Sequence, residues 1–181
     1  DTVTVKQPSA SRWGGISGHE TIVVGNGETG AAIPNPTNPD IVYNLSTGCI
    51  CGTGGSFTIN NLKTGQNEIR PIWPESTFGT PATEFKYRFN WHMPFFLSSH
   101  DNKTFYAAAN VVFRSTDEGM TWEEISPDLT KDLKDKQQLA GAPWLGEYFG
   151  QEIYSTIFRL EESPHEQGTL WVPAGQSPKL G

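Results

Sequence analysis

Apolar and polar residues alternate along much of this chain, in short runs that end at turns rich in Gly, Pro, Asn and Asp. Alternation with a period of two residues is typical of half-buried β-strands. The pattern predicts strands over Gly30–Pro34, Ile41–Leu45, Gly55–Asn60 and Asn67–Ile72, then over Pro94–Ser98, Thr104–Ala109, Val111–Arg114 and Thr121–Ile125, and finally over Ser155–Leu160 and Thr169–Val172. Only Asp128–Leu139 could form a helix. Because that segment is polar, we expect an exposed excursion with a helical turn or two.

The predicted strands repeat as a group. Ile33–Tyr43, Leu97–Tyr106 and Leu160–Trp171 each run from an apolar strand end, through a polar turn, to a closing aromatic residue. The closing aromatics lie 63 residues (43 to 106) and 65 residues (106 to 171) apart. Such a period, with four short antiparallel strands in each unit, is typical of the blades of a β-propeller. The sequence therefore predicts an all-β fold and, within that class, a β-propeller with four-stranded antiparallel blades.

About two and a half blades fit into this length, whereas propellers close with about four to eight. The expected divisions are 1–29 (the tail of a preceding blade and an entry loop), 30–93 (one blade), 94–154 (a second blade with a loop excursion over 126–150) and 155–181 (a partial, truncated blade). We expect an incomplete propeller, part of a larger protein. Its open edges would meet the remaining blades of the parent chain or another copy by self-association.

The most specific motif lies in the second predicted blade. Residues 115–122 spell S-x-D-x-G-x-T-W, the pattern called an Asp box. A carboxylate in such a turn can accept backbone N–H groups, and a glycine can adopt a positive φ. We expect a structural role in the hairpin for Ser115, Asp117, Gly119, Thr121 and Trp122. The segment Asn61–Gln66 looks like a degenerate copy of this turn.

Composition and charge exclude several classes of partner. The net charge of −7 and the pI near 5.0 argue against a nucleic-acid partner or an anionic membrane surface. No apolar run approaches the roughly 18 residues of a membrane-spanning helix. Cys49 and Cys51 are spaced as two strand side chains, and no further ligands are spaced to form a metal site with them. We therefore predict no metal and no cofactor.

Several runs of the chain resemble one known family. They are Leu62–Gln66, Ile72–Glu75, Phe85–Trp91, Phe113–Asp117, Ile125–Thr130 and Tyr154–Phe158. They are similar to large bacterial Asp-box (BNR-repeat) proteins of the sortilin and xyloglucanase-type, glycosyl-hydrolase-like superfamily, and the resemblance covers most of the chain. It implies a secreted or periplasmic protein that acts on or binds extracellular glycan. The alternative is a non-catalytic, sortilin-like module that binds an extracellular protein or peptide.

Sialidases carry the same turns, but their catalysis needs a cluster of three arginines that no motif here matches. In propellers, catalytic carboxylates lie where inner strands or top loops converge. The comparable positions, just before each first strand, hold Glu28 and Glu152, which are the candidate catalytic pair. Candidate ligand contacts, chosen as aromatic or polar residues in loop-like segments, are Trp13, Trp91, His92, Trp144 and Tyr154. Whether the parent protein is an enzyme stays open, and we expect this chain alone to be inactive.

Overall fold

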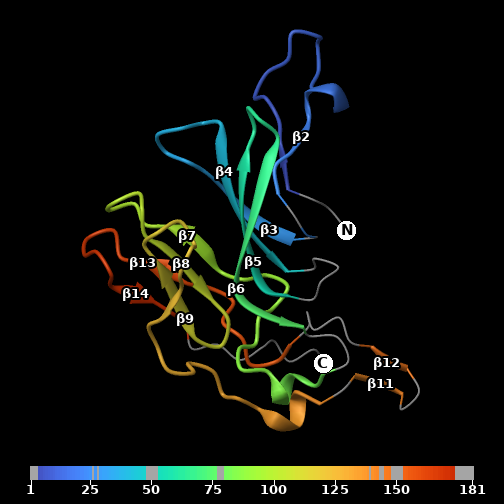
Figure 1. Ribbon diagram of the computed structural model, residues 1–181, viewed down its shortest axis with the longest axis vertical. Helices are drawn as coiled ribbons and strands as arrows, with labels where there is room; N and C mark the ends of the chain where they lie inside the picture. Colours follow the sequence, from blue (N-terminus) through green and yellow to red (C-terminus); the bar gives the residue numbers. More distant parts are fainter. Residues whose placement is uncertain are drawn as a thin grey trace.

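The computed structural model describes residues 4–25, 27, 29–47, 53–76, 80–138, 140–142, 145–147 and 153–173. These residues build an all-β fold around two four-stranded antiparallel sheets (Figure 1). The first sheet contains β3 (Thr29–Pro34), β4 (Ile41–Thr47), β5 (Thr53–Asn61) and β6 (Gln66–Ser76). The second contains β7 (Phe95–Leu97), β8 (Phe105–Ala108), β9 (Val112–Ser115) and β10 (Glu123–Glu124). In both sheets the strands lie side by side in chain order.

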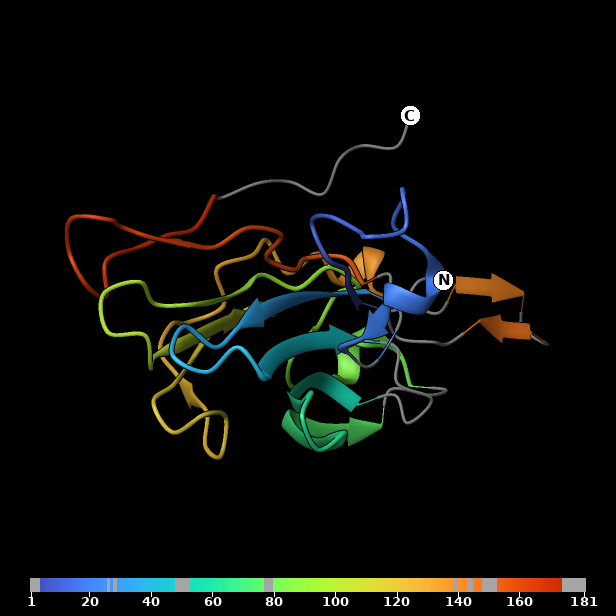
Figure 2. The ribbon, with the colours of Figure 1, turned by 90° about the horizontal axis from the view of Figure 1, so that it is seen from above.

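Three two-stranded pairs complete the described fold. They are β1 (Val5–Lys6) with β2 (Ile22–Val23), β11 (Ala140–Ala142) with β12 (Leu145–Glu147), and β13 (Glu161–Glu162) with β14 (Leu170–Trp171). The β11–β12 hairpin projects on the side of the molecule opposite β13 and β14 (Figures 1 and 2). Short 3₁₀ turns lie at Gly18–Glu20, Ala82–Glu84 and Lys134–Lys136.

The all-β class and the eight strands predicted for the first two units are confirmed. Within the described residues both four-stranded sheets are open and no sheet closes on itself, so the propeller stays a prediction. The third unit differs from expectation, because the predicted strand Ser155–Leu160 is wrong. Ser155 has a left-handed φ of 62°, and the Ile157 N–H donates to the Ala109 carbonyl of the second unit (2.7 Å). The first strand of this unit, β13, therefore begins only at Glu161.

The sequence repeat corresponds to a repeated hairpin. In each unit a backbone N–H donates to a carbonyl six residues later, from Asn35 to Ile41 (2.9 Å), from Ser98 to Thr104 (2.7 Å) and from Ser163 to Thr169 (2.8 Å). The closing aromatics face the first strand in the same way, in the pairs Ile33–Tyr43, Phe96–Tyr106 and Glu161–Trp171. The three segments found by spacing are thus the same local structure.

The two four-stranded sheets pack face to face over an aromatic core. Tyr43 and Phe57 of the first sheet contact Phe105 of the second, with ring centroids 4.8 and 5.3 Å apart. Alternate residues of β8 point the other way, so Tyr106 and Ala108 pack with Ile157 and Leu160 of the third unit. The strand β8 is therefore buried on both faces.

The segment that follows β10 is exposed at most of its described positions, as expected over Asp128–Leu139, and it is anchored to the body at a few of them. It contains one 3₁₀ turn, and its Gln137 is only 2% exposed. The reason is a buried arginine, Arg88, that draws carboxylates of this segment inward. The β11–β12 hairpin also lies inside the range 126–150 that was expected to be a loop.

Candidate functional site

The hairpin turn at residues 115–122 is closed by side-chain hydrogen bonds. Asp117 Oδ1 accepts the backbone N–H of Thr121 (2.9 Å), and Asp117 Oδ2 accepts the Thr121 hydroxyl (2.7 Å). The Ser115 hydroxyl donates to Asp117 Oδ1 (2.9 Å) and accepts the Gly119 N–H (2.8 Å). The bonds from Thr121, backbone first, hold the pKa of Asp117 below its ordinary value. Both carboxylate oxygens serve the turn, which fits a structural role.

The same turn docks onto the first sheet. The Tyr43 hydroxyl donates to Glu118 Oε1 (2.7 Å), and Arg70 Nη1 donates to the Glu118 carbonyl (2.6 Å). The indole of Trp122 meets the Phe57 ring edge-on, with centroids 5.7 Å apart. Burial, followed by the bond to Glu118, raises the pKa of Tyr43 to about 12. The turn therefore joins two units as well as two strands.

Replacing Asp117 with Ala should destabilise the chain by about 1–2 kcal/mol, because several hydrogen bonds to a charged carboxylate are lost at an exposed position. Urea denaturation followed by tryptophan fluorescence measures the change. Asp135→Ala is the matched control, since Asp135 is exposed and its one ion pair among the described residues, with Lys136, is 3.6 Å long. Equal stabilities of the two variants would contradict a structural role for Asp117.

A groove of about 600 Å³ lies where the first strands of the three units approach one another. β3 and β7 are neighbours, and the segment that leads into β13 forms the opposite wall. Its walls include Ala31, Phe96, Phe158, Arg159, Glu161 and Glu162. Its volume lies in the range of about 300–1,000 Å³ found for ligand pockets, and the groove is open to solvent.

The groove offers ring faces beside fixed charges. Phe158 is 50% exposed, and Phe96 is half-buried against the Tyr106 ring (5.2 Å between centroids). Arg159 Nε donates to Glu161 Oε1 (2.9 Å). Glu162 Oε1 accepts the Gly168 N–H (2.9 Å), whereas its Oε2 is buried without a hydrogen-bond partner. The arrangement can hold an apolar face and bind polar groups around its rim.

Three of the candidate ligand contacts lie on two joined segments outside this groove. The Asn90 side-chain amide donates to the Ile153 carbonyl (2.9 Å), which brings the segment of Trp91 and His92 next to that of Tyr154. His92 and Tyr154 are exposed, and Trp91 is half-buried. None of the three is among the described residues that line the groove.

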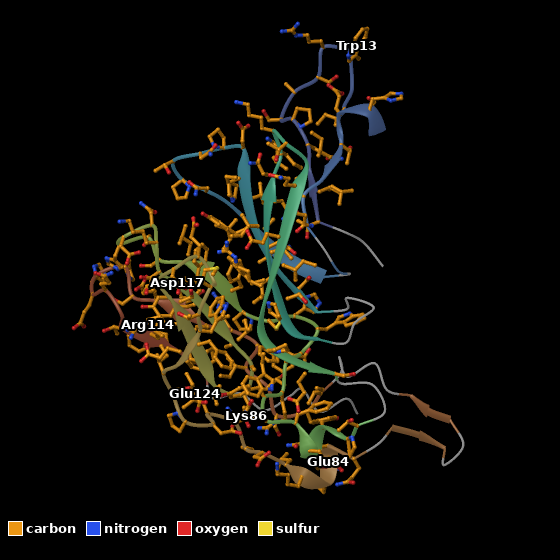
Figure 3. All side chains as sticks on the ribbon, viewed as in Figure 1. Trp13, Glu84, Lys86, Arg114, Asp117 and Glu124 are labelled. Carbon is orange, nitrogen blue, oxygen red and sulfur yellow. The ribbon has the colours of Figure 1, made fainter. Side chains whose placement is uncertain are left out.

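The remaining candidates are dispersed. Trp13 is 83% exposed at the tip of the N-terminal loop, far from Asp117 (Figure 3). Glu28, Trp144 and Glu152 lie outside the described residues, as do Cys49 and Cys51. The candidate catalytic positions lie just before each predicted first strand, so this criterion does not select the groove residues Phe96, Phe158 and Arg159. The repeat held a usable signal, because it marks β3, β7 and the start of the third unit as equivalent segments, and neighbouring repeats contact one another.

A second polar cluster is buried and is centred on Arg88, which is 3% exposed. Its guanidinium binds Asp128 Oδ2 (2.6 Å), Asp132 Oδ1 (3.0 Å) and the Ser155 carbonyl (3.1 Å). The Asn110 amide also donates to Asp128 (2.9 Å). Burial raises the pKa of Asp128, but hydrogen bonds led by Thr130 and Asn110 outweigh it, and the net pKa is lowered. Because charged partners occupy the guanidinium, we assign this cluster to the framework and not to a ligand site.

No protein-family model, curated protein or solved structure matches the chain in the comparisons. No cluster of three or more His, Cys, Asp or Glu suited to a metal ion occurs in the described part of the chain. No helix among the described residues is long and apolar enough to cross a membrane. The structure defines an all-β protein with two four-stranded antiparallel sheets. A turn closed by side-chain hydrogen bonds joins the two sheets, and a groove lies between the units.

Proposed function

We propose that this chain belongs to a secreted or periplasmic Asp-box β-propeller protein of the sortilin and xyloglucanase-type superfamily, and that its groove binds extracellular glycan. The blade assignment rests on the repeated four-stranded units and their equivalent turns. The closed turn at residues 115–122 supports the Asp-box relationship.

The observation that carries the binding proposal is the groove at the converging first strands. A sugar ring has an apolar face that can pack on the exposed ring of Phe158, and hydroxyl groups that can pair with Arg159 and Glu161. A groove of about 600 Å³ is large enough for a short glycan segment.

Binding fits the described groove better than hydrolysis does. Glycoside hydrolysis uses two carboxyl groups that flank the scissile bond from opposite sides. The groove carboxylates, Glu161 and Glu162, are adjacent on β13, and each is already held by another group of the chain. Glycan hydrolysis by the parent protein, with Glu28 or Glu152 as catalytic groups, is the second candidate.

Phe158→Ala should weaken glycan binding about tenfold, or about 1.4 kcal/mol, because it removes the exposed ring of the groove. A glycan array identifies a ligand, and isothermal titration calorimetry then measures its Kd for each variant. Trp13→Ala is the matched control, an exposed aromatic residue remote from the groove. It should leave the Kd unchanged.

Three outcomes would overturn the proposal as stated. Equal effects of Phe158→Ala and Trp13→Ala would place the site elsewhere. Release of new reducing ends would favour the hydrolase. Binding to a peptide library with no glycan binding would favour the sortilin-like alternative.

A further inference from the structure

The N-terminal arm, residues 5–23, carries an unusual concentration of exposed apolar side chains. Of the twelve large apolar side chains that are exposed among the described residues, five lie on this arm: Val5, Trp13, Ile16, Ile22 and Val23. The arm extends from the top of the molecule, with Trp13 at its tip (Figures 1 and 3). At its base the Val24 N–H donates to the Thr4 carbonyl (2.9 Å), which joins the two strands, and the Asn44 side-chain amide of β4 donates to the Thr4 hydroxyl oxygen (3.3 Å), which anchors the arm.

The arm is an incomplete sheet. β1 and β2 pair only with each other, with Val5 opposite Val23 and Lys6 opposite Ile22. Successive residues of a strand point to opposite faces, so Ile22 and Val23 place exposed apolar groups on both faces. An isolated two-stranded hairpin is marginally stable at best in water, and the exposed apolar groups of β1 and β2 favour a partner.

The third unit, described over residues 153–173, has a complementary surface. The first two units have four strands each, whereas β13 and β14 form a two-stranded sheet within the described residues. Trp171 on β14 is 65% exposed and borders a hollow of about 190 Å³ with Arg159 and Glu161. An edge strand with an exposed aromatic residue is a template for the addition of another strand.

Charge favours a match between these two surfaces. The arm has two cations, Lys6 and Arg12, and one carboxylate, Glu20. The third unit has three carboxylates, Glu161, Glu162 and Glu166, and a single cation, Arg159. Opposite net charges bring such surfaces together and set their register.

We propose that the N-terminal arm of one copy of this chain adds to the third unit of a second copy, with β1 and β2 continuing the β13–β14 sheet to four strands. The contact is heterologous, because two different surfaces meet and each copy keeps one of its two surfaces free. Such a contact builds a ring if its rotation closes and an open chain if it does not.

Light scattering coupled to size exclusion, over a concentration series, tests this association on the full chain. We expect the mass to rise above the 19.9 kDa of one copy as the concentration increases. The arm variant Ile22→Asp/Val23→Asp and the third-unit variant Trp171→Asp should each stay monomeric alone, with an association constant lowered at least tenfold. The matched control Ile69→Asp, on β6 and equally exposed, should associate as the wild type does.

Mixing the two defective variants gives the decisive result. The arm variant keeps an intact third unit and the third-unit variant keeps an intact arm, so the mixture should form a one-to-one pair of twice the single-copy mass. A wild-type chain that stays monomeric at every concentration would overturn the proposal. So would an absence of pairing in the mixture of folded variants, or an equal loss of association in Ile69→Asp.

Discussion

Arg88→Met should lower the free energy of unfolding by about 2–3 kcal/mol, less than for a fully buried ion pair, because Asp128 and Asp132 are 32% and 39% exposed. Arg88 is 3% exposed, and its loss leaves Asp128 and Asp132 without their shared cation. The Ser155 carbonyl loses its guanidinium donor as well. Urea denaturation at pH 7 measures the change.

The control for this variant is Arg114→Met. Arg114 also pairs with a carboxylate, that of Glu123 (2.6 Å), but its side chain is 43% exposed and that of Glu123 is 63% exposed. Exposed pairs contribute about 0–1 kcal/mol, so this variant should be nearly as stable as the wild type. Similar losses in the two variants would show that burial of Arg88 does not matter.

The acid dependence of stability should change with Arg88→Met in a defined direction. The pKa values of Asp128 and Asp132 are lowered in the folded chain, so these groups stabilise it in full above their unfolded pKa of about 3.9. The stabilisation is lost as the pH falls through the lowered folded values. Without Arg88 those values rise, so the loss of stability below about pH 4 should be shallower than in the wild type.

Gly119→Ala should destabilise the chain by about 2–4 kcal/mol, from backbone strain and overpacking together. Gly119 has a φ of 78°, a conformation that costs alanine energy. A Cβ at this position would also lie 2.5 Å from Cδ1 of Phe57, a fully buried core ring. Thermal and urea denaturation measure the loss.

Gly65→Ala separates the two causes. Gly65 lies in the turn of the first unit that resembles the one at Gly119, and its φ is 73°, but a Cβ there would meet nothing within 4 Å. It should therefore show the backbone strain alone, about 1–2 kcal/mol. Equal losses in Gly65→Ala and Gly119→Ala would mean that the contact with Phe57 relaxes freely.

The sequence predicted the two complete sheets well because their strands alternate cleanly and end at strong turn residues. It predicted the turn at Asp117 for the same reason, since the interactions that close this turn lie within a few residues. These features depend on local chemistry. The family relationship and the propeller stay proposals.

What the sequence did not predict depends on distant partners. Arg88 meets Asp128 and Asp132 only after the chain has folded, and charged residues are ordinarily expected on the surface. The polar segment after β10 is exposed as expected, but its anchoring through Asp128 and Asp132 has no local pattern to predict it. The predicted strand at Ser155–Leu160 failed for a similar reason, because its backbone pairs with Ala109 of another unit. The groove residues come together from three units, and no local pattern marks them.

The contact between the turn at Asp117 and the first sheet also sets an order for synthesis. Tyr43 and Phe57 are made early, but the groups that close over them, Glu118 and Gly119, emerge from the ribosome some sixty residues or more later. At a synthesis rate of about 5–20 residues per second, several seconds pass before the residues that cover the aromatic side chains of the first unit are made. In such a chain the following unit covers the apolar face of the unit before it. A pause in translation between Phe57 and Glu118 would therefore leave the aromatic face of the first sheet exposed to misassembly.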